Sequence, residues 1–205
     1  MATRRRITRE TALVGTVDAE ERFERFPSYF TAKGMFFARM MELGSDSTWR
    51  AVLPRLKKRP ALGRYLPFSD YPQEDFSRLA HAVAVQKQPA VDVVEAMRRL
   101  GRVDVSTFAK SSLGSVVFAL VAGDVRSALM KLPDMYRMSL KGGEVAATLD
   151  APDVVTLRFK DFYGWLDCYP VGQIEGLVAH YGRAVEIETD LANETTGTYR
   201  VHLGG

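Results

Sequence analysis

The chain of 205 residues has few of the side chains that bind metals or form cross-links. Its single cysteine, Cys168, excludes an internal disulfide, and its three histidines, His81, His180 and His202, are far apart in the sequence. None stands in an H-x-x-H or H-E-x-x-H spacing, which would bring two imidazoles to one metal ion. We therefore expect no metal site and a buried rather than reactive thiol. His81, in the apolar string RLAHAVAV, is the histidine most suited to line a pocket.

Long apolar runs are also missing, since none reaches the roughly 18 residues that cross a bilayer. The longest run, 116–122, predicts a buried helical segment. The sequence has no charged-then-apolar leader, so we expect a cytosolic protein without a transmembrane segment. Part of the modest net charge of +3 comes from Arg4, Arg5 and Arg6. We interpret 1–11 as a disordered basic tail and 12–205 as a single domain, with no specific nucleic-acid binding.

Motifs for nucleotide binding and nucleophilic catalysis are absent as well. The sequence contains no G-x-S-x-G elbow, no Walker-type loop and no G-x-G-x-x-G after a predicted strand. Glu186 and Glu188 share one face of a predicted strand, but the apolar residues between them place that face toward solvent. These absences weigh against an enzyme, although a catalytic site assembled from scattered residues stays open.

The longer, N-terminal part of the chain has helical periodicity. The clearest predicted helices are 29–43, 73–86, 89–101, 104–123 and 124–140. Gly101, following Arg98 and Arg99, has the position of a helix end. Pro133 predicts that the last segment is either two short helices or one bent helix.

After Gly142 and Gly143 the apolar period changes from about 3.6 residues to 2. The alternating segments, which predict strands joined by short turns, are 144–150, 154–162, 184–191 and 195–203. A helix at 170–182 lies between the second and third. This order predicts an α+β fold in which an N-terminal helical part packs against a C-terminal antiparallel sheet of about four strands with an intervening helix.

Three strings, KGMFF (33–37), RRLGR (98–102) and FYGWLDCYPVGQIEGLV (162–178), together with the order of elements, resemble a small uncharacterised family described from myxobacteria. More remotely, the chain is similar to the haem-nitric-oxide/oxygen-binding (H-NOX) domains and to the 4-vinyl reductase-type ligand-binding domains of the same superfamily. The resemblance implies helices packed on a four-stranded antiparallel sheet, with something apolar held between them.

The H-NOX resemblance also implies a haem site, but this chain has different residues at the positions that bind haem in H-NOX domains. An LDALH string carries the haem-ligating histidine in H-NOX domains, and the corresponding LPDMY places Tyr136 at that position. The Tyr-x-Ser-x-Arg motif for the haem propionates is replaced by YRMSLKGG (136–143). Phenolate can ligate ferric haem, but these changes favour Tyr136 as a packed aromatic residue with a hydrogen-bonded hydroxyl. We therefore expect no cofactor, with haem held by Tyr136 as a weaker alternative.

An aromatic loop joins the second predicted strand to the following helix. Phe159, Phe162, Tyr163, Trp165 and Tyr169 fall within eleven residues, more than a connection of this kind needs. The loop either closes the open end of the sheet or forms the rim of an apolar pocket or partner surface, with 67–76 as a second lip. The predicted pocket or partner surface comprises Phe37, Met41, His81, Phe118, Tyr136, Phe162, Tyr163, Trp165 and Tyr169.

These observations favour a non-catalytic ligand-binding or sensory module with an apolar pocket. A ligand that binds one packing of the helices better than another would shift that packing, and a protein partner would respond to the shift. The alternative is a structural or scaffolding protein that homodimerises through an exposed apolar face. A haem-dependent gas sensor is a third interpretation and an enzyme a fourth.

Overall fold

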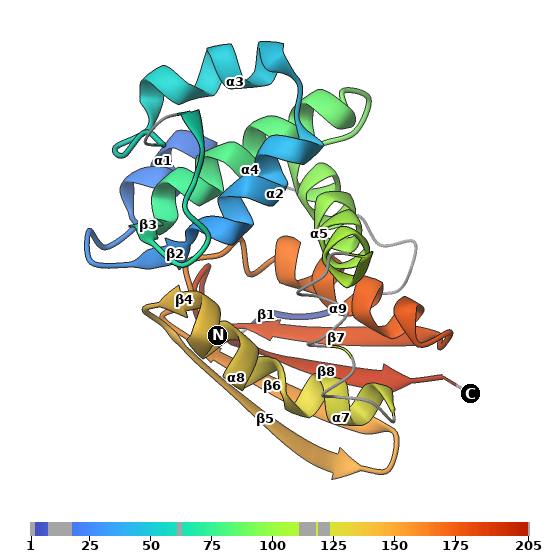
Figure 1. Cartoon of the computed structure of the whole chain (residues 1–205). Helices are drawn as coiled ribbons and strands as arrows, with labels where there is room; N and C mark the ends of the chain where they lie inside the picture. The colour runs from blue at the N-terminus through green and yellow to red at the C-terminus, as the bar shows by residue number, and fades with distance from the viewer. Residues whose placement is uncertain (1–2, 8–17, 61–62, 111–117, 119–123, 205) are drawn as a thin grey trace.

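The structure is a computed structural model that describes residues 3–7, 18–60, 63–110, 118 and 124–204. Figure 1 shows two layers, with α1 to α5 above and a larger antiparallel sheet below. The described helices are α1 (Ala19–Glu24), α2 (Gly34–Leu43), α3 (Asp46–Val52), the 3-10 helix η1 (Leu53–Arg55), α4 (Gln73–Lys87), α5 (Val93–Lys110), α7 (Val125–Met130), α8 (Leu132–Ser139) and α9 (Tyr169–His180). The described strands are β1 (Thr3–Ile7), β2 (Thr31–Lys33), β3 (Asp70–Pro72), β4 (Leu140–Lys141), β5 (Glu144–Ala151), β6 (Val154–Lys160), β7 (Val185–Leu191) and β8 (Gly197–Leu203).

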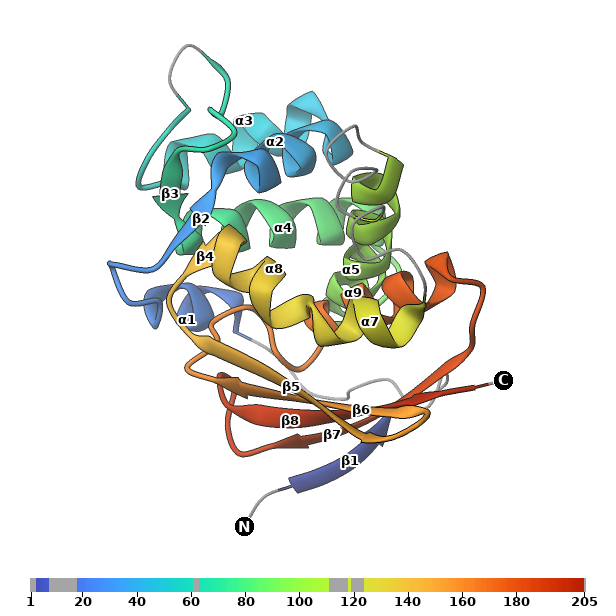
Figure 2. The ribbon, with the colours of Figure 1, turned by 60° about the horizontal axis from the view of Figure 1, so that its bottom comes forward.

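The larger sheet has the strand order β1-β7-β8-β6-β5, and all neighbouring strands are antiparallel. Because successive strand residues point to opposite faces, β6 buries Val155, Leu157 and Phe159 on one face. Figure 2 shows α7 and α8 lying across this sheet, and Leu129 of α7 and Ile174 of α9 belong to the same core. The predicted α+β fold is confirmed.

The basic N-terminus differs from the expected disordered tail. Thr3–Ile7 forms the edge strand β1 and pairs with β7, with Arg5 opposite Thr189. The edge of a sheet presents unpaired backbone N–H and C=O groups, and β1 satisfies those of β7. The sheet therefore has five strands instead of about four. The organisation of the chain as one domain stays a prediction.

A smaller sheet with the order β3-β2-β4 brings distant segments of the chain together. The prediction of one helix over 29–43 is wrong at its start, because Thr31–Lys33 pairs with β3 and with β4 and α2 begins only at Gly34. After β4 the chain turns into β5 through Gly142 and Gly143, whose φ angles of 109° and 76° suit glycine. This connection links the helices to the larger sheet.

Helix α5 also departs from its prediction, since it continues through Gly101 to Lys110. A Cβ at Gly101 would lie 2.3 Å from the carbonyl oxygen of Tyr169, and one at Gly172 would lie 1.9 Å from that of Arg98. The two glycines therefore permit α5 and α9 to cross at backbone contact. Gly101 is a packing residue in this helix and does not end it.

The segment that begins at Asp124 forms two short helices, one of the two predicted outcomes. The Asp124 carboxylate caps α7 by accepting hydrogen bonds from the backbone N–H groups of Arg126 and Ser127, at 2.7 and 2.9 Å. Pro133 lies in the first turn of α8. Apart from Phe118, the apolar run 116–122 lies outside the described residues.

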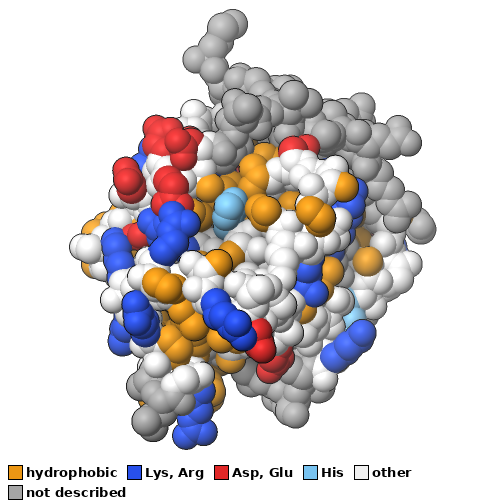
Figure 3. Space-filling view, turned by 90° about the horizontal axis from the view of Figure 1, so that it is seen from above, with side chains coloured by type: hydrophobic (Ala, Val, Ile, Leu, Met, Phe, Trp, Pro, Cys, Tyr) orange, Lys and Arg blue, Asp and Glu red, His pale blue; other side chains and the backbone are white. Residues whose placement is uncertain are grey.

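Charged residues on the helical layer form ion pairs. In Figure 3 acidic and basic side chains lie together at one margin of the face seen from above. Glu20 pairs with Arg55 and Arg78, and Glu74 pairs with Lys57 and Arg78. No helix in the described part of the chain has the length and apolar character needed to span a membrane.

Candidate ligand-binding pocket

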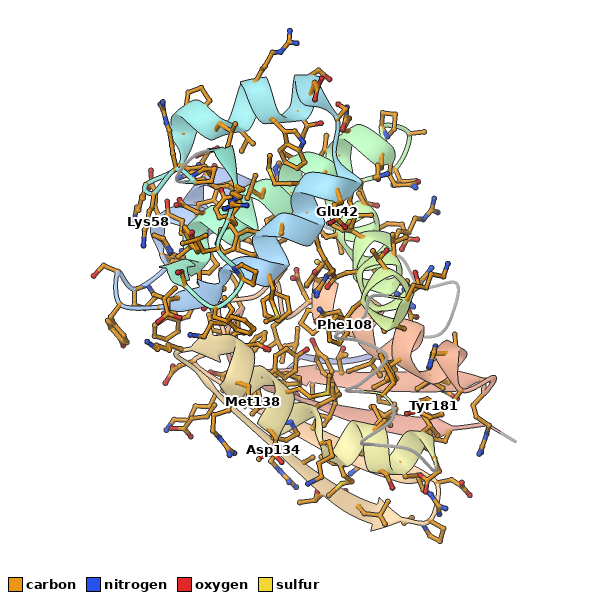
Figure 4. The ribbon with its side chains drawn as sticks, in the orientation of Figure 1. Glu42, Lys58, Phe108, Asp134, Met138 and Tyr181 are labelled. Carbon is orange, nitrogen blue, oxygen red and sulfur yellow. The ribbon has the colours of Figure 1, made fainter. Side chains whose placement is uncertain are left out.

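A cavity of about 140 Å³ lies between the two layers. Helices α2, α4, α5, α8 and α9 and the aromatic loop line it. Most of its lining is apolar or aromatic, including Phe36, Phe76, Met97, Phe108, Leu132 and Ile174. Figure 4 shows Phe108 at the end of α5 nearest the sheet, where the two layers meet. The cavity is therefore a predominantly apolar space between α2, α4 and α5 of the helical layer on one side and, on the other, the aromatic loop and the helices α8 and α9, which contact the larger sheet.

A buried hydrogen-bond network forms the polar part of the wall. The Asp104 carboxylate accepts from Arg39 Nε at 2.8 Å, from the Tyr169 hydroxyl at 2.8 Å and from Gln173 Nε2 at 3.1 Å. The Tyr136 hydroxyl donates to Gln173 Oε1 over 2.9 Å. These contacts connect α2, α5, α8 and α9. A change in the packing of any of these helices would disturb the network.

The two tyrosines of this network are un-ionised. Burial raises the pKa of Tyr136 above its ordinary value, and the nearby Asp104 carboxylate raises it further. The pKa of Tyr169 is raised well above its ordinary value, chiefly by burial and then by the same carboxylate. Both phenols are therefore hydrogen-bond donors at neutral pH.

The aromatic loop is held against α4 through Trp165. The Trp165 indole N–H donates to Ser77 Oγ over 2.7 Å, and the His81 ring stacks on the indole with centroids 5.7 Å apart. The Arg22 guanidinium lies 4.6 Å from the indole centroid and forms two 2.7 Å hydrogen bonds with Asp167. Trp165 has a φ of 56°, a strained conformation for a bulky residue, which these contacts stabilise.

The structure brings six of the nine predicted site residues together in the cavity wall. They are Phe118, Tyr136, Phe162, Tyr163, Trp165 and Tyr169. Gln73 and Phe76, from the predicted second lip, also line it.

Three predicted site residues lie outside the described lining of this cavity. Helix α2 presents Phe36 and Arg39 to the cavity, whereas Phe37 and Met41 pack into the core of the helical layer. His81 contacts Trp165 and Phe23 instead of the cavity. Burial lowers its pKa, which favours the neutral ring.

The residues that could hold a metal are dispersed in the described part of the chain. There, no three His, Cys, Asp or Glu side chains form a group able to hold a metal ion. His180 packs on Phe118, with ring centroids 4.5 Å apart, and His202 Nε2 lies 3.6 Å from Glu188. Cys168 is buried, and burial raises the pKa of its thiol, as expected for an unreactive cysteine.

Sequence reasoning missed three polar residues of the wall that form its buried network: Arg39, Asp104 and Gln173. One signal was available at Arg39, a charged residue inside the apolar string GMFFARMM. A buried arginine needs an anionic partner. Nothing local identifies that partner as Asp104, which is 65 residues away.

The solved structures that this chain is similar to include several H-NOX proteins. An H-NOX protein from S. oneidensis in the Fe(II)NO ligation state has a TM-score of 0.65 at 15% identity, over 84% of this chain and 99% of that one. A mutant Fe(II) unliganded H-NOX protein from K. algicida has a TM-score of 0.64 at 12% identity, over 84% and 97%. An oxygen-binding H-NOX domain related to soluble guanylate cyclases has a TM-score of 0.62 at 17% identity, over 84% and 93%. The H-NOX-like fold is thereby confirmed.

Sequence comparison gives a family without a known function. Residues 13–202 match the family described as Protein of unknown function (DUF2378). No curated protein matches the chain significantly.

The expectation of no cofactor is corrected by the structural comparison. One similar structure concerns haem distortion in the H-NOX family, and another concerns haem redox potential. Haem is therefore the cofactor to test in this fold.

The residues described around the cavity do not fit haem in this conformation. The described lining contains no histidine or cysteine that could ligate the iron, and the Tyr136 hydroxyl donates a hydrogen bond to Gln173. Arg39, the cation of this lining, is paired with Asp104 and is not available to a propionate.

Proposed function

The chain belongs to the DUF2378 family of proteins of unknown function, and we propose that it is a non-catalytic sensory module that binds a small apolar ligand in the interlayer cavity and signals to a protein partner. The main support for the proposal is the apolar cavity, which lies between α2, α4 and α5 on one side and α8, α9 and the aromatic loop on the other. An apolar cavity of roughly 150 Å³ is large enough for benzene. The similar H-NOX structures, one of them described as oxygen-binding, support a ligand-binding role.

Ligand binding would act on the packing between the layers. The network around Asp104 joins four helices at the cavity wall, and Trp165 joins the aromatic loop to α4. A ligand that favours one arrangement of these elements shifts its population by its difference in affinity. The loop 162–169, which lines the cavity and continues into α9, is the element through which we propose that a partner responds.

A non-catalytic role agrees with the chemistry of the wall. The Asp104 carboxylate accepts hydrogen bonds from Arg39, Tyr169 and Gln173. A general base must be free to accept a proton from a substrate, and this carboxylate already accepts three hydrogen bonds within the wall. Tyr136 and Tyr169 are neutral donors and therefore poor nucleophiles.

Native mass spectrometry, combined with hydrogen exchange, tests this function. We expect extra mass that disappears on denaturation, or uptake of an added small aromatic compound. Binding should slow amide exchange in α5, α9 and the loop 162–169. If no apolar probe binds, and exchange stays the same with every probe, the sensory proposal is wrong.

Homodimerisation through an apolar face is the second candidate. Tyr29 and Phe68 are 74% and 76% exposed, and Lys33 Nζ donates to the Phe68 carbonyl. Exposed aromatic side chains are typical anchors of protein interfaces. The same native spectrum reports the oligomeric state, and a dimer that dissociates when Tyr29 and Phe68 are both changed to serine would support this alternative.

A further inference from the structure

Gln73 is held at the cavity by contacts at both its backbone and its side chain. It is the first residue of α4, and its backbone N–H donates to the Phe30 carbonyl over 3.0 Å. Its side-chain Nε2 donates to the Tyr163 carbonyl over 3.1 Å. Gln73 is 4% exposed and lines the cavity. Its amide is therefore fixed in place before any ligand arrives.

The hydrogen bond to Tyr163 also fixes which way the amide faces. A backbone carbonyl can only accept, so the nitrogen of the Gln73 amide must face Tyr163 and the oxygen must face away. That oxygen, Oε1, is buried and has no hydrogen-bond partner among the described residues. Of the buried side-chain polar atoms in this part of the chain that lack a partner, only this one belongs to a residue of the cavity lining. The wall of the cavity thus contains an unused acceptor.

An unused buried acceptor is unfavourable, because Oε1 has lost water without gaining a partner. A ligand with one O–H or N–H group would satisfy it. A charged group on the ligand would be unfavourable, because the charged residues of the described lining, Arg39 and Asp104, already neutralise each other and leave no counter-charge for it. The remainder of the ligand would face mainly aromatic and aliphatic side chains.

We propose that Gln73 Oε1 is the polar anchor of the pocket, and that the ligand is a small uncharged aromatic molecule with one hydrogen-bond donor, of the phenol type. The inference rests on the proposed ligand-binding function and names the class of ligand. It also gives Gln73 a specificity-determining role. The volume of about 140 Å³ suits a single aromatic ring.

Binding of phenol, toluene and anisole tests the role of Gln73 separately from the ligand-binding function. Phenol and toluene have nearly the same shape, but only phenol can donate to Oε1. A wholly apolar cavity prefers toluene, because a phenol hydroxyl would lose its hydrogen bond to water. We expect the unaltered 205-residue chain to bind phenol roughly three- to tenfold more tightly than toluene in calorimetric titrations. Anisole, which has the oxygen but no donor, should show no such gain.

The variant Gln73→Met removes the acceptor and keeps the length of the side chain. We expect it to reverse the preference, so that toluene binds more tightly than phenol. Gln86→Met is the matched control on the same helix, since Gln86 is exposed and bonds to Thr48 and Ser45 instead of the cavity. It should leave the preference for phenol unchanged.

The outcomes distinguish the two proposals. Binding of none of the three probes would overturn the ligand-binding function itself. Binding of toluene as tightly as phenol by the unaltered protein would overturn the role of Gln73 while leaving the function standing. If Gln73→Met fails to fold, the comparison of phenol with anisole in the unaltered protein still decides, because equal affinities would show that no donor is recognised.

Discussion

Arg39 of α2 and Asp104 of α5 form a 2.8 Å ion pair in which the side chains are only 10% and 2% exposed. The guanidinium also lies 4.7 Å from the ring centroid of Phe36 and 4.9 Å from that of Phe108. Two charges removed from water are tolerated only when each satisfies the other. The pair therefore fixes how α2 and α5 meet at the cavity.

Removing one member of this pair should destabilise the protein strongly. Asp104→Asn leaves the Arg39 charge without a counter-charge, and we expect a loss of about 3–5 kcal/mol in the free energy of unfolding. The measurement is urea denaturation followed by circular dichroism. Glu95→Gln is the control, because it breaks the more exposed Arg99–Glu95 pair within α5 and should cost only about 0.3–0.5 kcal/mol. Equal losses in the two variants would contradict the structural role of the buried pair.

Tyr136 can be tested as a haem ligand by spectroscopy. Its hydroxyl is buried, un-ionised and bonded to Gln173. We therefore predict that Tyr136→Phe leaves the absorption spectrum of haemin-titrated protein unchanged, while it destabilises the fold by about 1–3 kcal/mol by removing the hydrogen bond to Gln173 Oε1. A change of the haem bands in the Phe variant, with the unaltered protein as reference, would identify Tyr136 as an iron ligand.

Much of the fold could be predicted because its signals are local. The change of apolar period after Gly142 and Gly143 marks the start of the larger sheet, and the alternation along β6 identifies its buried face. Asp124 caps a helix through its immediate neighbours. Each of these features depends on residues a few positions apart.

The errors arose where distant residues decide the local structure. Thr31–Lys33 is a strand because β3 and β4 pair with it, and these lie about 40 and 110 positions further along the chain. Of the pocket, the aromatic residues of the loop were recognisable by composition. The network of Arg39, Asp104 and Gln173 was not, because it exists only after α2, α5 and α9 have packed.

The contact between α5 and α9 should tolerate no added atom at Gly172. A Cβ there would lie 1.9 Å from the Arg98 carbonyl oxygen, which belongs to the backbone and cannot move aside cheaply. We predict that Gly172→Ala lowers the free energy of unfolding by about 1–3 kcal/mol or more, despite the better helix propensity of alanine. Thermal denaturation measures the loss. Ala179→Ser, at an exposed position of the same helix, should cost about 0.5 kcal/mol. A Gly172→Ala variant as stable as the unaltered protein would mean that the helices are further apart than described.

The stability of the protein should fall in mild acid because of His81. Burial lowers the pKa of His81 below its ordinary value of 6.5, with a smaller opposing effect from Glu20. The unfolded chain therefore binds a proton at a pH where the folded protein does not, and protonation favours unfolding. The stabilisation from neutral His81 is fully present above about pH 6.5 and is lost progressively as the pH falls from 6.5 toward the lower pKa of the folded state.

The variant His81→Phe tests this prediction, because phenylalanine keeps the aromatic contact with Trp165 but cannot be protonated. Urea denaturation at several pH values between 7.5 and 5 should thus show a smaller fall in the free energy of unfolding for His81→Phe than for the unaltered protein. Identical pH profiles for His81→Phe and the unaltered protein would show that His81 is already protonated, or equally solvated, in the folded state.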